Sequence, residues 1–169
     1  DGLQDAVRSL QAGRSLVVHT AGAVPMNVLT SCSTRTGVFY PLQTLVFGME
    51  TDFRQVPLLL EVNTQENLDL LKELAESLSE QVCLADSERR GRIHLAAVFA
   101  SNFSYHLYTI ALEMMAKEGL PMSILHPLIL ETARRAVRGI PGSAQTGPAV
   151  RGDMNVMQLH KEMLKNNSL

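Results

Sequence analysis

His94, Asn102 and His106 stand out because they are polar side chains within an otherwise apolar helical pattern. On a repeat of about 3.6 residues per turn, Asn102 lies about 80° around the helix from His94, and His106 lies one turn beyond Asn102. All three can therefore line one side of the helix. An imidazole exchanges a proton near neutral pH, and a carboxamide both donates and accepts hydrogen bonds. This spacing suits a site that protonates and orients a substrate.

The same groups could instead satisfy one another in a protein core, where buried polar atoms normally have hydrogen-bond partners. For His94 and Asn102 both interpretations stay open on spacing alone. For His106, and for His126 farther along the chain, we expect the structural role of a satisfied buried polar group.

The helix that carries these groups is predicted over residues 88–120. Ser87 is a candidate N-cap, and Gly119 followed by Pro121 is typical of a helix end. Apolar residues leave little of its circumference polar, so we expect a buried central helix. They are Leu95, Val98, Phe99, Phe103, Leu107, Ile110, Leu112 and Met115.

Strands and helices alternate before this helix, which predicts an α/β layer. Asn63 with Glu66 resembles a capping box and indicates the start of a helix. The strand at 15–19, SLVVH, has a compact apolar centre, as in strands buried on both faces of a parallel sheet. The expected elements are helices at 1–12, at 26–29 and after Asn63, and strands at 15–19, 37–40, 56–62 and 81–84.

Small and polar residues follow two of these strands, at the edge where open α/β sheets bind ligands. Thr20, Ala21 and Gly22 begin a loop that a polar ligand can approach closely, although it could also be a plain connection into the helix at 26–29. Gln43 and Thr44, shortly after Tyr40, offer hydrogen-bond donors and acceptors.

Everything after the central helix is predicted to be helical. Pro127 should kink or loosen the start of a helix over 122–138, and Asp153 should cap a helix over 154–166. The loop at 139–152 is rich in glycine, proline and small polar residues, and loops of this length in compact domains are often functional.

Composition excludes several classes of partner. The chain has 169 residues, a net charge of −2 and dispersed basic residues, so we expect no binding to nucleic acid or to a membrane surface. Cys32 and Cys83 have no ligand-like spacing, which predicts neither a metal site nor a disulfide framework and favours the cytoplasm. Because the chain opens on Asp1 within a helical pattern, we expect it to be part of a longer protein.

Five segments together resemble a bacterial family of NADP-dependent oxidoreductases that has a Rossmann-like N-terminal part and a helical C-terminal domain. They are VHTAGAVPMNVL, GVFYPLQTL, ADSERRGRIHLAAVFASNFSYHLY, ETARRAV and AQTGPAVRGDMNV, in this order over nearly the whole chain. The family is similar in architecture to pyrroline-5-carboxylate reductases and to the 6-phosphogluconate and 3-hydroxyacid dehydrogenases. In those relatives the first long C-terminal helix lines the substrate cleft, and the C-terminal domains pair into dimers.

The resemblance implies that residues 1–86 are the second half of a Rossmann-like sheet and that residues 87–169 are a helical domain for substrate binding and dimerisation. No G-x-G-x-x-G follows a predicted strand, so the residues that hold the cofactor pyrophosphate are expected before Asp1. This chain alone should therefore bind NADP weakly or not at all.

The resemblance also implies the reaction, hydride transfer from NADPH to a carbonyl or imine carbon of a small metabolite. His94 stands near the position where relatives have a lysine and would be the acid, and Asn102 would orient the substrate. A non-catalytic dimerising or binding module is the alternative. The further site residues implied are His19, Thr20 and Gly22 for the cofactor, and Tyr40, Gln43, Thr146, Gly147 and Arg151 for the substrate.

Overall fold

The computed structural model describes residues 2–139, 142 and 145–166, and it divides into two units, Asp1–Phe103 and Ser104–Leu169. The first unit combines a four-stranded sheet with helices, and the second is helical in its described part. This confirms the predicted order of an α/β part followed by an all-α part. The division falls one helix later than the boundary expected after residue 86.

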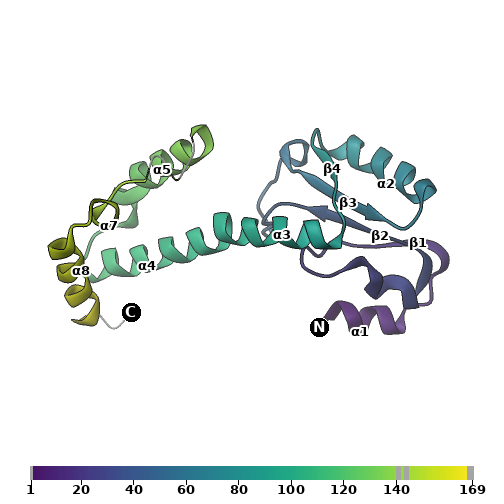
Figure 1. The fold of residues 1–169 in the computed structure, drawn as a ribbon, viewed down its shortest axis with the longest axis horizontal. Coiled ribbons are helices and arrows are strands. Elements are labelled where there is room, and N and C mark those ends of the chain that lie inside the picture. Colours follow the sequence, from purple (N-terminus) through teal and green to yellow (C-terminus); the bar gives the residue numbers. More distant parts are fainter. Residues whose placement is uncertain (1, 140–141, 143–144, 167–169) are drawn as a thin grey trace. The chain divides into compact units, whose positions relative to one another are not determined.

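The sheet has the strand order β1-β2-β3-β4, formed by β1 (Gly13–His19), β2 (Ser33–Pro41), β3 (Leu58–Val62) and β4 (Val82–Leu84) (Figure 1). β1 pairs with β2 in parallel, and β3 pairs with β4 in parallel. β2 and β3 are antiparallel, with Tyr40 opposite Leu59. The carboxyl ends of β1 and β2 therefore meet the amino ends of β3 and β4 at one edge of the sheet.

Helices cover both faces of this sheet. α2 (Gln65–Leu78) lies on one face and α3 (Ser87–Ala97) on the other (Figure 1). Because successive side chains of a strand point to opposite faces, Leu58 and Leu60 of β3 join the core under α2, whereas Leu59 packs with Val38 and Tyr40 under α3. A third cluster packs α1 (Gly2–Ser9) and the 3₁₀ helix η1 (Met26–Ser31) against β1.

Two predicted helix caps are displaced by one residue, because the side chains expected to cap the helices form hydrogen bonds with residues of the sheet instead. The Thr64 hydroxyl caps α2 by accepting from the Asn67 amide, whereas Asn63 accepts from the Thr36 amide and donates to the Thr34 carbonyl. The expected cap at Asn63 is therefore wrong.

The cap of α3 shows the same displacement. The Asp86 carboxylate accepts from the Arg89 amide at 2.7 Å, whereas the hydroxyl of Ser87 donates to the Glu61 carboxylate. A long-range hydrogen bond thus removes Ser87 from the role that its type and position favour.

The expected burial of β1 on both faces is wrong. His19 is buried, but Val18, which points to the opposite face, is 38% exposed. β1 lies at one end of the strand order of the described sheet, so one of its sides has no hydrogen-bonded neighbour among the described residues.

The predicted central helix is not a single buried α-helix. Its regular turns stop after Ala97, and a π-helical segment, η3 (Val98–Phe103), follows and leads into α4 (Ser104–Lys117). Leu95, Phe99 and Leu107 are all more than half exposed. An apolar circumference predicts that a helix must pack against another segment to be buried, but it does not show that such a segment is present.

The second unit consists of α4, the 3₁₀ turn η4 (Met122–Leu125), α5 (His126–Arg138), α7 (Pro148–Arg151) and α8 (Met154–Asn166). Pro127 lies in the first turn of α5 after the 3₁₀ turn, which confirms the expected loose start. Asp153 accepts from the Val156 amide at 3.2 Å, which confirms the predicted cap of α8. His106 and His126 are exposed, so the expectation that they are buried is wrong.

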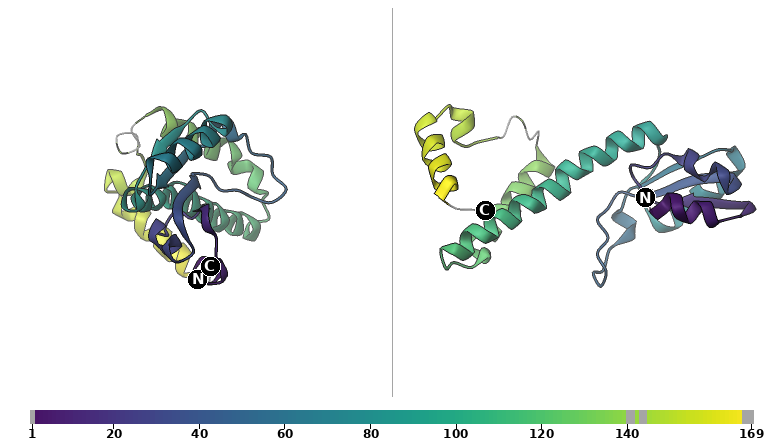
Figure 2. Two further views of the ribbon diagram at one scale, coloured as in Figure 1. Left: turned by 90° about the vertical axis from the view of Figure 1, so that its right-hand side faces the viewer. Right: turned by 90° about the horizontal axis from the view of Figure 1, so that it is seen from below.

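None of the described helices combines the length and the apolar character that crossing a bilayer requires. In the α/β unit, the connection between β2 and β3 extends away from the sheet as an open loop (Figure 2). Its apolar side chains Leu45, Val46, Phe47 and Met49 are exposed.

Candidate functional site

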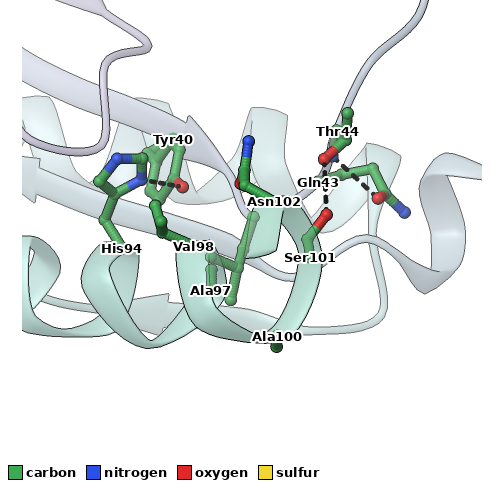
Figure 3. A pocket seen from close by; sticks show the side chains of 10 residues that line it. Tyr40, Gln43, Thr44, His94, Ala97, Val98, Ala100, Ser101 and Asn102 are labelled. Carbon is green, nitrogen blue, oxygen red and sulfur yellow. Dashed lines mark hydrogen bonds between the residues drawn. The ribbon is translucent and has the colours of Figure 1, made fainter. Parts of the chain in front are cut away.

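A cavity of about 360 Å³ lies in the α/β unit, between the end of β2 and the segment where α3 passes into η3 (Figure 3). Its walls combine small apolar groups with hydroxyl, amide and imidazole groups. They are formed by Tyr40, Leu42, Gln43, Thr44, His94, Ala97, Val98, Ala100, Ser101 and Asn102.

The central polar contact in this cavity joins Tyr40 and His94. The phenol oxygen lies 3.0 Å from His94 Nδ1, and the two rings meet edge to face with centroids 5.9 Å apart. Burial raises the pKa of Tyr40, and the positive charge of Arg90 only partly offsets that rise. The phenol therefore keeps its proton near neutral pH and donates to Nδ1 of a neutral imidazole; if the imidazole is protonated, the direction of donation reverses.

Gly22 brings the loop after β1 against this pair. A Cβ atom at Gly22 would lie 2.4 Å from His94 Nδ1 and 2.8 Å from Tyr40 Cζ, closer than carbon atoms tolerate. Both rings would have to move, and their mutual hydrogen bond with them. The missing side chain of Gly22 is thus explained by the close approach of its backbone to the pair.

His19 lies behind this loop and is buried. Its Nδ1 accepts from the Ala21 amide at 3.1 Å, so in the neutral ring Nε2 carries the proton. Burial, and after it the charge of Arg90, lowers the pKa of His19. The Pro25 carbonyl favours the charged ring weakly, but Nε2 has no hydrogen-bond partner within the described part of the chain.

The far wall of the cavity is built by η3 and by the start of the β2–β3 connection. The Ser101 and Thr44 hydroxyls are 3.2 Å apart, and the Thr44 amide donates to the Gln43 side chain at 2.9 Å. Asn102 projects between this contact and the Tyr40–His94 pair (Figure 3). π-helical segments are rare in proteins, but those that occur are often found at functional sites. Here the wider π-helical turn presents Val98, Ser101 and Asn102 to one cavity.

The structure brings four of the residues proposed from sequence into one cavity, namely Tyr40, Gln43, His94 and Asn102. Gly22 packs against it, whereas Thr20 is exposed and His19 is buried, and neither lines it. Thr146, Gly147 and Arg151 belong to the helical unit, at and just before α7.

Sequence reasoning assigned no site role to Arg90, Glu61 or Ser87, which form a hydrogen-bonded network beside the site; Arg90 is buried and the other two are partly buried. Arg90 itself carries no sequence signal that separates it from the neighbouring arginines at 89 and 92. Glu61 carried a usable signal, because an acidic residue inside the apolar run VPLLLEV indicates a buried charge that needs a partner.

The loop after β1 is only partly accessible at the carboxyl edge of the sheet. Thr20 and Ala23 are exposed, Ala21 is half-buried and Gly22 is buried. The described residues include no glycine-rich turn that opens a helix at this edge, which the pyrophosphate of a dinucleotide would need.

The chain therefore consists of an α/β unit followed by a helical unit. The α/β unit has a polar cavity between the end of a strand and a helix that continues into a π-helical segment. The chain belongs to the family described as Domain of unknown function (DUF2520), whose profile matches residues 56–169.

Solved structures that are similar to this chain include the following two. The crystal structure of the "putative NADP oxidoreductase" BF3122 from Bacteroides fragilis has a TM-score of 0.87 and 46% identity, over 90% of this chain and 59% of that one. Protein TM1727 from Thermotoga maritima has a TM-score of 0.75 over 98% of this chain and 67% of that one; at 23% identity it shows the fold alone. No curated protein matches the chain.

Proposed function

We propose that this chain is part of an NADP-dependent oxidoreductase that reduces a carbonyl or imine carbon of a small metabolite. The observation that carries the proposal is the hydrogen bond between Tyr40 and His94 inside a polar cavity. The name of the Bacteroides fragilis protein, 46% identical, supports the class of reaction and the cofactor. The chain spans 59% of that protein's length, so the proposal concerns the whole enzyme.

NADPH, when bound, supplies the hydride, and the residues of this chain supply a proton. The buried Tyr40 phenol keeps its proton and donates it to the substrate oxygen or nitrogen as negative charge develops there. His94 Nδ1, when protonated, donates to the phenol oxygen and replaces the lost proton. His94 is thus the proton source and Tyr40 the group that touches the substrate.

The remaining polar residues orient the substrate. Asn102 and Gln43 offer carboxamides on the two sides of the cavity, and the Thr44–Ser101 contact holds the connection after β2 against η3. Thr20 and the half-buried peptide group at Ala21 hold the nicotinamide end of NADP, with Gly22 packed against the Tyr40–His94 pair and His19 supporting the loop from behind. Correct placement of reacting groups accounts for much of enzymatic rate enhancement.

The helical unit provides the dimer interface. None of its described residues is buried, although Leu107, Ile124, Leu128 and Leu159 are large, apolar and about half exposed or more. A second copy of the chain covers these side chains, because helices this apolar need a packed partner to be stable in water. The segment with Thr146, Gly147 and Arg151 then contributes to substrate binding from the partner subunit.

The competing function, a dimerising module without chemistry, explains the apolar helices but not the polar cavity. It gives no reason for a phenol and an imidazole to share a proton beside a glycine that must remain small. The two unpaired cysteines are consistent with work in the reducing cytoplasm.

The test uses the full-length protein. Calorimetric titration should detect NADPH binding, and a screen of small carbonyl and imine compounds should reveal NADPH oxidation. His94→Ala should retain the fold and lower turnover by about 100-fold, the usual size of an acid–base contribution. His106→Ala, which changes an exposed histidine of the helical unit, is the matched control. Parental turnover in His94→Ala, or no NADPH binding by the full-length protein, contradicts the proposal.

A further inference from the structure

Arg90 is a charged side chain that is completely buried on α3. Its guanidinium forms an ion pair with the Glu61 carboxylate of β3 and donates to the Val24 carbonyl in the loop after β1. One side chain therefore joins three separate parts of the α/β unit: a helix, a strand and the loop that contains Gly22.

Ser87 makes a second link between the same parts. Its hydroxyl donates to the Glu61 carboxylate at 2.8 Å and accepts from the Met26 amide at 2.9 Å. The loop after β1 is thus attached to the first turns of α3 through both Val24 and Met26.

The strand register places this network next to the catalytic pair. His19, Val38 and Glu61 are paired across β1, β2 and β3, so they form one row on the face that α3 covers. Tyr40 lies two residues beyond Val38, in the next row on the same face. Arg90 and His94 are one helical turn apart, and they contact these two successive rows through Glu61 and Tyr40.

Stability alone explains this network poorly. Burying two charges costs solvation, and apolar replacements of buried ion pairs are often as stable or more stable. A buried ion pair does, however, hold its two partners in a fixed geometry. Here that geometry fixes where the Gly22 backbone meets the rings of His94 and Tyr40.

We propose that Arg90 is a positioning residue, which with Glu61 and Ser87 holds the loop after β1 against α3 so that Gly22 keeps the Tyr40–His94 hydrogen bond in place. This inference rests on the proposed role of the Tyr40–His94 pair in proton donation. Arg90 touches neither ring of the pair through a hydrogen bond and acts through the loop.

The experiment compares Arg90→Met and Arg90→Lys with Arg92→Met in the full-length protein. Arg92 is the matched control because it is on the same helix, is exposed and also pairs with a glutamate, Glu88. The first readout is the ¹⁵N resonance of His94 Nδ1 in histidine-labelled protein, for which Tyr40→Phe supplies the value without the hydrogen bond. The second is the pH profile of NADPH-dependent turnover.

Arg90→Met should shift the His94 Nδ1 resonance toward the Tyr40→Phe value, change the pH profile and lower turnover at least tenfold. Arg90→Lys keeps the positive charge but loses the planar guanidinium with its several donors, so it should show the same displaced His94 resonance. The pKa of His19 should stay lowered in this variant, because burial and a nearby positive charge both remain. Arg92→Met should match the parent in every readout.

A folded Arg90→Met protein with the parental His94 resonance and the parental pH profile overturns the proposal. If Arg90→Met does not fold, Arg90→Lys decides, because it keeps a positive charge beside Glu61 but loses the planar guanidinium that also reaches the Val24 carbonyl. A displaced resonance in Arg90→Lys supports the proposal, and a parental one overturns it. The His94 resonance is measured without substrate, so the two proposals can fail separately. A displaced His94 resonance in Arg90→Met together with full activity of His94→Ala would refute the proposed function and leave the positioning role of Arg90 intact.

Discussion

The two units of this chain use similar proportions of apolar residues in opposite ways. The α/β unit packs its apolar side chains into three clusters around the sheet, and the same unit contains the Arg90–Glu61 ion pair, the buried His19 and the hydrogen-bonded Tyr40–His94 pair. The helical unit leaves many of its large apolar side chains exposed, and none of its described residues is buried. The first unit therefore contains the core that positions its candidate site, whereas the second buries none of its described side chains, which is the reason for proposing that it forms an interface.

The largest effect should come from placing a charge on the apolar surface of the helical unit. Leu107→Glu combined with Leu128→Glu should convert the proposed dimer into monomers, because burying either leucine side chain contributes about 1.5–3 kcal/mol and an unpaired buried carboxylate costs more. Light scattering across a range of protein concentrations measures this.

Leu70→Glu is the matched control, since Leu70 is 51% exposed but belongs to α2 in the α/β unit. That variant should remain dimeric. If the double variant also remains dimeric, the helical unit does not provide the interface.

The next largest effect should be the loss of stability when a core side chain of the α/β unit is shortened. This loss should not depend on protein concentration. Leu60→Ala should lower the free energy of unfolding by about 2–5 kcal/mol, because Leu60 is fully buried under α2. Urea unfolding at two protein concentrations measures it. A loss that changes with concentration would show that the α/β unit also depends on association.

Gly22→Ala tests the close approach on which the site depends. The added methyl group should cost about 1–3 kcal/mol of stability and displace the Tyr40–His94 pair, with a fall in turnover of about tenfold or more. Gly91→Ala on α3 has no atom near its new methyl group and should raise helix stability by about 0.5–1 kcal/mol. Equal activity in the two variants would contradict the structural role of Gly22.

The smallest effect should be a dependence of stability on pH that originates in His19. Its pKa in the folded protein is lowered from 6.5, first by burial and then by Arg90, so below that pH the unfolded chain binds more protons than the folded one. The contribution is complete above about pH 6.5 and is lost as the pH falls toward the folded-state pKa. His19→Gln should flatten the slope of unfolding free energy against pH in this range, and an unchanged slope would exclude His19 as its origin.

The sequence predicts the element order of both units because apolar runs and turn residues are local signals. Val82 to Leu84 and the helix after Asp153 are recognisable from their own residues. Three features are not recognisable in this way. Asn63 and Ser87 leave the helix caps for long-range hydrogen bonds, β3 reverses direction, and the π-helical segment interrupts a regular apolar pattern.

The sequence predicts those residues of the candidate site whose polar side chains are unexpected at their positions in a helix or at a strand end. His94, Asn102, Tyr40 and Gln43 are polar residues on a helix or at a strand end, and they share one cavity. Arg90 was overlooked because arginines at a helix start are usually solvated, and only the fold shows that this one is buried against Glu61. The proposed contribution of Arg151 would require a partner subunit, which a single chain does not contain.

The most direct test of the proton relay is a double-mutant cycle on Tyr40→Phe and His94→Ala in NADPH-dependent turnover by the full-length protein. If the two side chains act as one proton donor, each single variant should lose about 100-fold and the double variant little more than the worse single one. Losses that multiply in the double variant, or a single variant with parental turnover, would contradict the account.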